Sequence, residues 1–297
     1  SIKIIPALGD CCNLEFLENL FRNEKVDIVF HAAAYKHVPL VEINPLNSIN
    51  NNVFSTLNIC IASKNLSIKK VLMISSDKAV RPTNIMGASK RLSEIIVQAF
   101  ANDAQKNSLN KKHQKTCFSM VRFGNVLSSS GSAVPLFIKQ ISSGGPVTLT
   151  HPKITRYFMT IKEAAQLVIQ SSAMAQGGEV FLLDMGKPIC IRDLVIKLIK
   201  LSGLKLKDNS NPYGDIEIKI TGLRPGEKLF EELLIDAEAE KTDHTLIFRA
   251  KENFIMMEEI IPKLENLKKN IDDRNKLEVL NILNELVKEW ENQNRIN

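Results

Sequence analysis

The sequence predicts an α/β protein built on a doubly wound, mostly parallel sheet. Short apolar runs alternate with longer segments whose apolar residues recur at the spacing of one helix face. Strands that alternate with helices in this way form parallel βαβ units, and helices cover both faces of their sheet. The chain has 297 residues, enough for one sizeable core or two joined domains.

The first part of the chain supplies strands and helices in strict alternation. The expected strands cover residues 2–8, 26–30, 71–74 and 117–121. A helix capped by Asn13 follows the first strand, and another runs from Asn44 to about residue 64. A third helix contains Met86 and continues to about residue 104, before a polar surface loop over residues 102–115.

After Asn125 the character of the sequence changes, and we expect a smaller α/β substrate domain on the C-terminal side. Helices are expected over residues 134–141, 161–174 and 191–201 and again from residue 258, with strands over 147–149, 179–183 and 216–220. We therefore predict a Rossmann-like domain over residues 1–125 and a second domain with the C-terminal helices over 126–297. The strand near residues 179–184 is expected to join the first sheet.

Composition and charge argue against several classes of protein. The chain is 44% hydrophobic and 24% charged, as in ordinary globular proteins, and no apolar stretch approaches the roughly 18 residues that span a bilayer. The net charge of +6 is spread evenly, which suits an anionic small substrate better than nucleic acid. Five Cys without a C-x-x-C pair indicate a reducing, cytosolic setting, and the scattered His predict no metal site.

A Gly-rich turn is missing from the front of the predicted sheet. Rossmann-like domains normally open with a strand, a G-x-G-x-x-G turn and a helix, but here Gly144-Gly145 and Gly177-Gly178 lie too late. The chain also begins with Ser1 rather than Met. We therefore expect the first strand, turn and helix to lie upstream of residue 1, and this fragment to be inactive alone.

The most informative stretch runs from Ser75 to Lys90. Ser75-Ser76-Asp77-Lys78 follows the strand 71–74, and ligands of open α/β sheets sit at such strand ends. Met86 and Lys90 are four residues apart on the next helix, so they share a face that the strand end would meet across a cleft. A Tyr at position 86 would complete the hydroxyl–Tyr–Lys group of short-chain dehydrogenases, but the chain has Met there.

Six motifs occur along the chain in a specific order. They are His31 to Pro39, Ser75 to Ala79, Met86 to Arg91, Arg122 to Val126, Leu149 to Thr160 and Arg224 to Leu229. Together they resemble the extended short-chain dehydrogenase/reductase family, and more narrowly its polysaccharide-biosynthesis (CapD-like) UDP-N-acetylglucosamine 4,6-dehydratases. The large, membrane-anchored members of that group are similar in having Met in place of Tyr.

The resemblance implies a lyase (hydro-lyase) that converts UDP-N-acetylglucosamine to a UDP-4-keto-6-deoxy-N-acetylhexosamine for surface polysaccharide or glycan biosynthesis. C4 is oxidised, C5 loses a proton, the C6 hydroxyl leaves as water and hydride returns to C6. NAD or NADP therefore stays bound and is regenerated in each cycle. The resemblance further implies a homo-oligomer whose cytoplasmic catalytic domain is tethered to the inner membrane by segments outside this chain.

The resemblance also implies roles for the residues around the strand end. Asp77 is the acid for the leaving water, and Lys78 is the C5 base, which requires a lowered pKa. Ser76, or Ser75, would contact the C4 oxygen. Met86 cannot shuttle a proton, so the C4-hydroxyl proton must pass to Asp77, Lys90 or a water molecule.

Further contacts are assigned by resemblance along the whole chain. The expected cofactor contacts are Asp10, Ala32, Ala33, Ala34, Asn52, Ser75, Lys90 and Phe123. The expected substrate contacts are Lys36, Asn125, Arg156, Arg224 and Glu227. Arg224 would clamp the pyrophosphate, because the guanidinium group binds phosphate through two parallel hydrogen bonds.

Two alternative functions stay open from the sequence. A UDP-sugar epimerase or a C5-inverting dehydratase would share part of the chemistry, although the Asp77-Lys78 pair favours elimination. A non-catalytic nucleotide-sugar-binding sensor is favoured by the absence of Tyr at position 86. NAD and NADP are not distinguished, because the position that discriminates them is expected upstream of residue 1.

Overall fold

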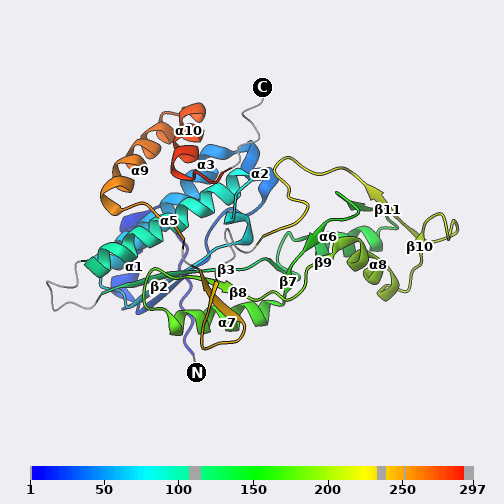
Figure 1. The fold of residues 1–297 in the computed structure, drawn as a ribbon, viewed down its shortest axis with the longest axis horizontal. Coiled ribbons are helices and arrows are strands. Elements are labelled where there is room, and N and C mark those ends of the chain that lie inside the picture. Colours follow the sequence, from blue (N-terminus) through cyan, green and yellow to red (C-terminus); the bar gives the residue numbers. More distant parts are fainter. Residues whose placement is uncertain (1, 107–114, 233–238, 251, 291–297) are drawn as a thin grey trace.

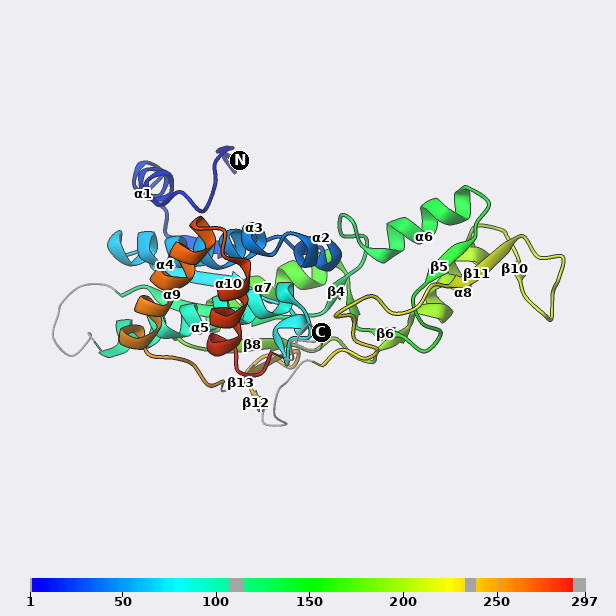
Figure 2. The same cartoon turned by 90° about the horizontal axis from the view of Figure 1, so that it is seen from above.

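The computed structural model describes residues 2–106, 115–232, 239–250 and 252–290. The molecule is elongated, with a large lobe around the main sheet and a small lobe at one end (Figures 1 and 2). Most of the surface loop expected over residues 102–115 lies outside the described residues. None of the helices in the described part of the chain combines the length and apolar character needed to cross a bilayer.

The main sheet has six strands in the described part of the chain, in the order β1-β2-β3-β8-β13-β12. The strands are β1 (Ile28–His31), β2 (Lys70–Ile74), β3 (Cys117–Arg122), β8 (Val180–Leu183), β13 (Ile247–Ala250) and β12 (Ala239–Lys241). The first four are parallel, and the last two are added antiparallel. The predicted α/β sheet is confirmed, and the strand expected near residues 179–184 pairs with β3.

Alternate residues of the central strands point into two cores, as expected for a sheet buried on both faces. Val71 and Met73 enter the core shared with α4 (Ser55–Asn65) and α5 (Ile85–Lys106). Leu72 lies in the opposite core, beneath α7 (Ile161–Met174). Figure 1 shows α5 and α7 on opposite sides of the sheet.

The C-terminal helices α9 (Met257–Asp272) and α10 (Lys276–Leu286) cover α5 (Figure 1). Leu264 and Leu283 are buried in the same core cluster as Met73. We expected these helices in the second domain, whereas the structure packs them on the large lobe. Their apolar stripe packs against α5, whose residues 85–101 are all buried, and no sequence pattern identifies this partner. The domain boundary at residue 125 remains a prediction.

The N-terminal segment differs from the expected strand. Asn13 caps α1 (Leu14–Asn23) as predicted, with its side chain accepting a hydrogen bond from the Phe16 N–H at 3.0 Å. Residues 2–8, however, form no strand, and Ile4 is 86% exposed. A strand exists only where another strand satisfies its backbone. No strand of the described chain lies beside residues 2–8, so this prediction is wrong.

The helix expected from Asn44 to about residue 64 is continuous but not uniform. It consists of α3 (Pro45–Ile49), the π-helical turn η1 (Asn50–Phe54) and α4, and it follows the short helix α2 (Val38–Ile43). Within the π turn the Asn52 carbonyl accepts hydrogen bonds from the hydroxyls of Thr56 and Ser93. Such turns often occur at functional sites.

The small lobe is built around the parallel sheet β10-β11-β5 and two helices. Its elements are α6 (Ala133–Ser142), β5 (Val147–Leu149), α8 (Ile191–Leu201), β10 (Leu206–Lys207) and β11 (Ile216–Ile220). Two short ladders, β4 (Asn125–Val126) with β7 (Phe158–Met159) and β6 (Thr155–Arg156) with β9 (Ile189–Cys190), lie between this lobe and the large lobe. A separate core cluster that includes Phe137, Val147 and Ile216 fills the lobe.

Candidate active site

The segment after β2 is held against the end of β3 by its backbone. The Asp77 N–H donates to the Phe123 carbonyl at 3.2 Å. Ser76 then caps the short 3₁₀ turn η2 (Asp77–Ala79), because its hydroxyl accepts from the Lys78 N–H at 3.2 Å. The same hydroxyl donates to Asp77 Oδ1 at 2.9 Å. Local chain geometry therefore fixes the orientation of both charged side chains.

Asp77 and Lys78 form an ion pair at this strand end. Lys78 Nζ lies 2.9 Å from Asp77 Oδ1. The Asp77 side chain has no exposed surface, and its Oδ2 has no hydrogen-bond partner among the described residues. The Lys78 side chain is 23% exposed. Lys78 is thus the more exposed member of the pair.

Glu231 is a second acidic neighbour of Lys78, with Oε1 at 3.6 Å from Nζ. Burial alone would lower the pKa of Lys78, but the charges of Asp77 and Glu231 outweigh it and raise that pKa above its ordinary value; Arg156 opposes them weakly. The lowered pKa that the role of C5 base requires is therefore not found in this arrangement, in which the adjacent Asp77 is the larger of the two acidic influences on the pKa of Lys78 and Glu231 adds to it.

A central cavity of about 310 Å³ opens between the two lobes. Its lining includes Lys36, Lys78, Asn125, Arg156, Arg224, Glu227 and Glu231. The five expected substrate contacts are thus all brought together around Lys78. Its four basic side chains, against two carboxylates, favour an anionic ligand.

The loop that carries Arg224 is fastened to the start of α5. Thr83 Oγ1 and Asn84 Nδ2 both donate to the Gly226 carbonyl, at 2.8 and 3.0 Å. Gly226 has φ +72°, and an added Cβ would lie 2.8 Å from the Asn84 Cβ, so glycine is needed there. This docking brings Arg224 and Glu227 to the cavity.

Arg156 lines the cavity, but its guanidinium group also donates hydrogen bonds to the loop that carries Arg224. Its Nη2 donates to the Lys228 carbonyl at 2.9 Å, and its Nη1 donates to the Thr155 carbonyl at 2.7 Å. Glu227 and Glu231 lie 3.5 and 3.6 Å from its guanidinium group. The structure therefore gives Arg156 a role in holding the loop.

Met86 and Lys90 are buried, with 4% and 6% exposure, and neither belongs to the described lining of the central cavity. Lys90 Nζ donates to the Ile74 carbonyl at 2.7 Å. Burial lowers the pKa of Lys90 to about 8, against the opposing charge of Glu94. The expectation that Lys90 faces the strand-end side chains across a cleft is not met, because its amine bonds to the last carbonyl of β2.

Ser75 belongs to a buried charge network, which we define as Ser75, Arg91, Glu94, Arg122 and Glu252. The Ser75 hydroxyl donates to Glu94 Oε1 at 2.6 Å. Arg122 grips both oxygens of Glu94, at 2.7 and 2.6 Å, and also binds Glu252. Arg91 Nη1 lies 3.3 Å from Glu94 Oε2. Ser75 was expected to contact the cofactor, but its hydroxyl is engaged within this network.

The end of β1 presents small side chains and a fixed backbone. Ala32 and Ala33 are exposed, and Ala34 is half-buried. Asn52, from the π turn, accepts from the Tyr35 N–H at 2.7 Å and donates to the Tyr35 carbonyl at 3.1 Å. Small side chains on a rigid, uncovered strand end fit the close approach of a flat ring.

The remaining expected cofactor contacts are placed differently. Phe123 is half-buried at the end of β3, where its carbonyl accepts from Asp77. Asp10 is exposed, and its Oδ1 accepts from the Cys12 N–H at 2.8 Å. We expected Asp10 at a strand end, whereas it follows the segment 2–8, which forms no strand.

Glu231, Thr83 and Asn84 are the site residues that sequence reasoning missed. Glu231 lies only two residues beyond the motif that ends at Leu229, but a Glu in such a charged segment usually faces solvent. Thr83 and Asn84 resemble ordinary helix-capping residues, and Asn84 Oδ1 does accept from the Gly87 N–H at 2.8 Å. Their contact with Gly226 has no local sequence signal.

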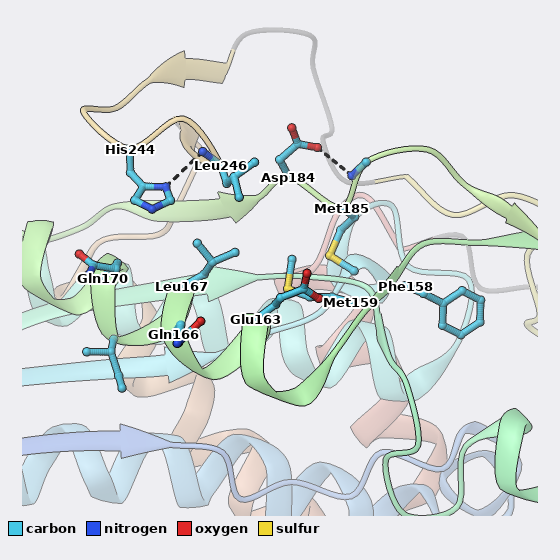
Figure 3. A pocket seen from close by; sticks show the side chains of 12 residues that line it. Phe158, Met159, Glu163, Gln166, Leu167, Gln170, Asp184, Met185, His244 and Leu246 are labelled. Atoms are coloured by element: carbon cyan, nitrogen blue, oxygen red, sulfur yellow. Dashed lines mark hydrogen bonds between the residues drawn. The ribbon is translucent and has the colours of Figure 1, made fainter.

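A second cavity, of about 630 Å³, lies between α7 and the ends of β8 and β13 (Figure 3). Glu163, Asp184 and His244 lie around it, and its described lining contains neither Lys nor Arg. Glu163 already serves the capping box of α7 with Thr160. This cavity is larger than the central one, but it lacks the cations and the acid–base pair, so the central cavity is the candidate active site.

The parallel sheet, the Ser76-Asp77-Lys78 strand end and the helix with Met86 and Lys90 define a protein of the short-chain dehydrogenase/reductase type. A family profile described as "Polysaccharide biosynthesis protein" matches residues 1–252. The chain therefore belongs to this polysaccharide biosynthesis protein family, and the sequence-based family prediction is confirmed.

Characterised relatives fit this membership. The chain is 46% identical over 281 residues to the capsular polysaccharide biosynthesis protein CapD of Staphylococcus aureus, covering 94% of this chain and 44% of CapD. It is 46% identical over 227 residues to the probable polysaccharide biosynthesis protein EpsC of Bacillus subtilis, covering 76% of this chain and 35% of EpsC. The chain thus spans less than half the length of these two relatives.

A UDP-glucose 4-epimerase from Rickettsia rickettsii is 35% identical over 241 residues, which cover 81% of this chain and 65% of the epimerase. Among solved structures, Pen from Bacillus thuringiensis superposes with a TM-score of 0.70 at 33% identity, covering 88% of this chain and 81% of Pen. A dTDP-glucose 4,6-dehydratase, DesIV from Streptomyces venezuelae, solved with NAD bound, shares the fold at 19% identity and a TM-score of 0.63, covering 76% of this chain and 69% of DesIV.

Proposed function

We propose that the protein containing this chain catalyses the NAD(P)-dependent 4,6-dehydration of UDP-N-acetylglucosamine, as a lyase of polysaccharide biosynthesis. The observation that carries the proposal is the central cavity, where Lys78, the ion-pair partner of Asp77, lies among the basic side chains of Lys36, Arg156 and Arg224. The polysaccharide-biosynthesis family and the nucleotide-sugar dehydratases and epimerases among its structural neighbours support it.

Substrate binding would use the basic and amide groups of the cavity. Arg224 and Lys36 would take the pyrophosphate, since both line the cavity and both carry charge-assisted donors. Asn125 Oδ1 is buried and has no partner in the described structure, so it can accept from a sugar hydroxyl or from the acetamido N–H. Glu227 would accept hydrogen bonds from the hydroxyl groups of the ribose.

NAD or NADP, when bound, supplies hydride exchange at C4 and later at C6. Ala32 and Ala33 would let the nicotinamide approach the end of β1, and Asn52 keeps that backbone in place through Tyr35. Lys90 would hold the ribose of the cofactor. Phe123 and Ala34 would line the edge of the same cofactor site.

The proton steps fall to Asp77 and Lys78. In the described arrangement the proton lies on Lys78, 2.9 Å from Asp77 Oδ1. Transfer of that proton to Asp77 would give a neutral amine and a protonated acid, with no proton exchanged with solvent. Lys78 could then take the C5 proton, and Asp77 could protonate the departing C6 hydroxyl. When hydride returns to C6, the protonated Lys78 would give a proton back to C5. Exclusion of water by the sugar would favour the neutral pair.

The proposal is tested with the full reading frame that encodes this chain, UDP-N-acetylglucosamine and D₂O. NMR should show a 4-keto-6-deoxy product with deuterium at C5. Inversion at C4 or C2 without loss of water would instead establish the epimerase, a candidate favoured by the 35% identical UDP-glucose 4-epimerase. Tight UDP-sugar binding without any product would establish the sensor. Either result would contradict the dehydratase proposal.

A further inference from the structure

We infer that Glu231 is a positioning residue of the proposed site: one carboxylate oxygen pairs with the Lys78 ammonium group, and the other receives a hydrogen bond from the bound sugar. This inference rests on the proposed function and deepens it. The family motif that ends at Leu229 gave Glu231 no role, and the case for it comes from contacts in the folded chain.

Glu231 is held between two cations inside the protein. Its side chain is only 4% exposed, and Oε1 lies 3.6 Å from Lys78 Nζ and 3.6 Å from Arg156 Nε. Arg156 is itself fixed by the Lys228 and Thr155 carbonyls. The carboxylate is therefore fixed beside Lys78 by these contacts. It follows the loop that carries Arg224 and Gly226.

The second oxygen of Glu231 is left without a partner. Oε2 is buried and forms no hydrogen bond within the described chain, although Glu231 lines the central cavity. Buried polar atoms are nearly always bonded, so such an atom points to a ligand group that completes it. Asp77 Oδ2 is left in the same state. Both carboxylates contact Lys78, but of the two only Glu231 belongs to the described lining of the cavity, where a sugar hydroxyl offers the donor that Oε2 lacks.

These contacts couple substrate binding to the charge of Lys78. The charged groups that act on Lys78 are Asp77, Glu231 and Arg156. A sugar hydroxyl that donates to Glu231 Oε2 partly neutralises the carboxylate charge. The attraction of Glu231 for the proton on Lys78 then becomes weaker. The remaining attraction then comes from Asp77, which is also the group that receives the proton. Glu231 thus keeps Lys78 charged before substrate arrives and releases it afterwards.

The test measures the titration of Lys78 directly, in the product of the full reading frame and without substrate. Competitive labelling with acetic anhydride at a series of pH values, read by mass spectrometry, reports the neutral fraction of each lysine. Glu231→Gln should lower the Lys78 midpoint by about one pH unit, which corresponds to about 10-fold more labelling below the midpoint. Glu231→Asp, which keeps the charge, should return most of that shift.

Glu232→Gln is the matched control. It removes the same charge one residue further on, from a side chain that is 45% exposed and lies 3.7 Å from Arg81. The Lys78 midpoint should not move in this variant. An unchanged midpoint in Glu231→Gln, with folding verified by circular dichroism, would overturn the inference, as would an equal shift in Glu232→Gln.

Ligand affinity tests the sugar contact separately. Glu231→Gln should weaken binding of UDP-N-acetylglucosamine by about 10-fold, because the sugar hydroxyl loses its hydrogen bond to a charged carboxylate. Binding of UDP should be unchanged, because UDP has no sugar to make this bond. Equal weakening for both ligands would contradict the sugar contact. If the wild type yields no 4-keto product while the Lys78 midpoint still shifts, the dehydratase proposal fails and the Glu231–Lys78 coupling stands.

Discussion

Two buried charge clusters lie side by side at the end of β2, and neighbouring serines belong to each. Ser75 bonds to Glu94 in the buried charge network, and Ser76 bonds to Asp77 in the site. In the network, both oxygens of Glu94 are bonded to Arg122. In the site, Asp77 Oδ2 and Glu231 Oε2 have no partner in the described structure.

The difference separates a structural cluster from a functional one. Burial would raise the pKa of Glu94, but Arg122 and Arg91 more than compensate and lower it, so the network is charged and complete. The site instead combines a cavity with acceptors that lack donors. A protein tolerates such incomplete bonding where a ligand supplies the missing groups. On this account the network stabilises the fold, and the site performs chemistry.

The largest expected effect is on catalysis. Lys78→Met should lower the rate of dehydration by about 10²–10⁴-fold, the range that general acid–base groups contribute, and should spare UDP binding. Product formation is followed by NMR and UDP binding by calorimetry. Lys219→Met, which changes an exposed lysine of β11, is the control and should keep full activity. An active Lys78→Met enzyme would remove Lys78 from the mechanism.

The largest expected effect on stability is in the network. Glu94→Gln leaves the fully buried Arg122 short of its main partner, and the free energy of unfolding should fall by about 3–5 kcal/mol. Urea unfolding measures it. Glu285→Gln, in the exposed pair with Lys263, should cost no more than about 1 kcal/mol. Similar losses in the two variants would show that the network contributes no special stability.

Much of this arrangement could be predicted from sequence, but only where the cause is local. The apolar runs around Leu72 and Phe118 predicted the central strands. The family resemblance assigned Lys36 and Arg224 to one substrate site, and both line the central cavity. The segment 2–8 has a strand-forming composition, but a strand also needs a neighbour, which local composition does not report.

The charge of Lys78 could not be predicted for a related reason. The adjacent Asp77 is the larger of the two charges that raise its pKa, but the second, Glu231, is brought from a distant part of the chain by the loop docked on Thr83 and Asn84. The π turn over Asn50–Phe54 also lacks a sequence signal, because its five residues, three of them Asn, show no periodicity that would distinguish a π turn from an α-helix. Contacts between distant segments thus decided the parts that sequence reasoning missed.

Lys90 is a further buried charge at the end of β2, where its amine donates to the Ile74 carbonyl. Its pKa is about 8 in the folded chain, below the ordinary 10.5, so between these pH values the unfolded chain binds a proton that the folded chain does not. Relative to Lys90→Met, the stability of the wild type should therefore rise by about 3 kcal/mol as pH increases from 8 to 10.5. Urea unfolding of both proteins across this range measures the difference. Parallel pH curves would show that Lys90 titrates normally.

A smaller effect is expected at the rim of the cavity. Arg224→Ala should weaken UDP binding by about 10–100-fold, because it removes charge-assisted hydrogen bonds to the pyrophosphate. The rate at saturating substrate should change much less, since Arg224 takes no part in the proton steps assigned to Asp77 and Lys78. Calorimetry with UDP, compared with the Lys219→Ala control, measures the change. Unaltered UDP affinity would place the pyrophosphate elsewhere.

Asp77→Asn, compared with Glu94→Gln, tests the contrast between the two clusters most directly. Both substitutions replace a fully buried carboxylate by the amide of the same shape, one in the site and one in the network. We predict that Asp77→Asn abolishes dehydration while the free energy of unfolding stays within about 1 kcal/mol of the wild type, because Asp77 already lacks one partner. An Asp77→Asn protein that still forms the 4-keto product, or that unfolds as readily as Glu94→Gln, would contradict the account.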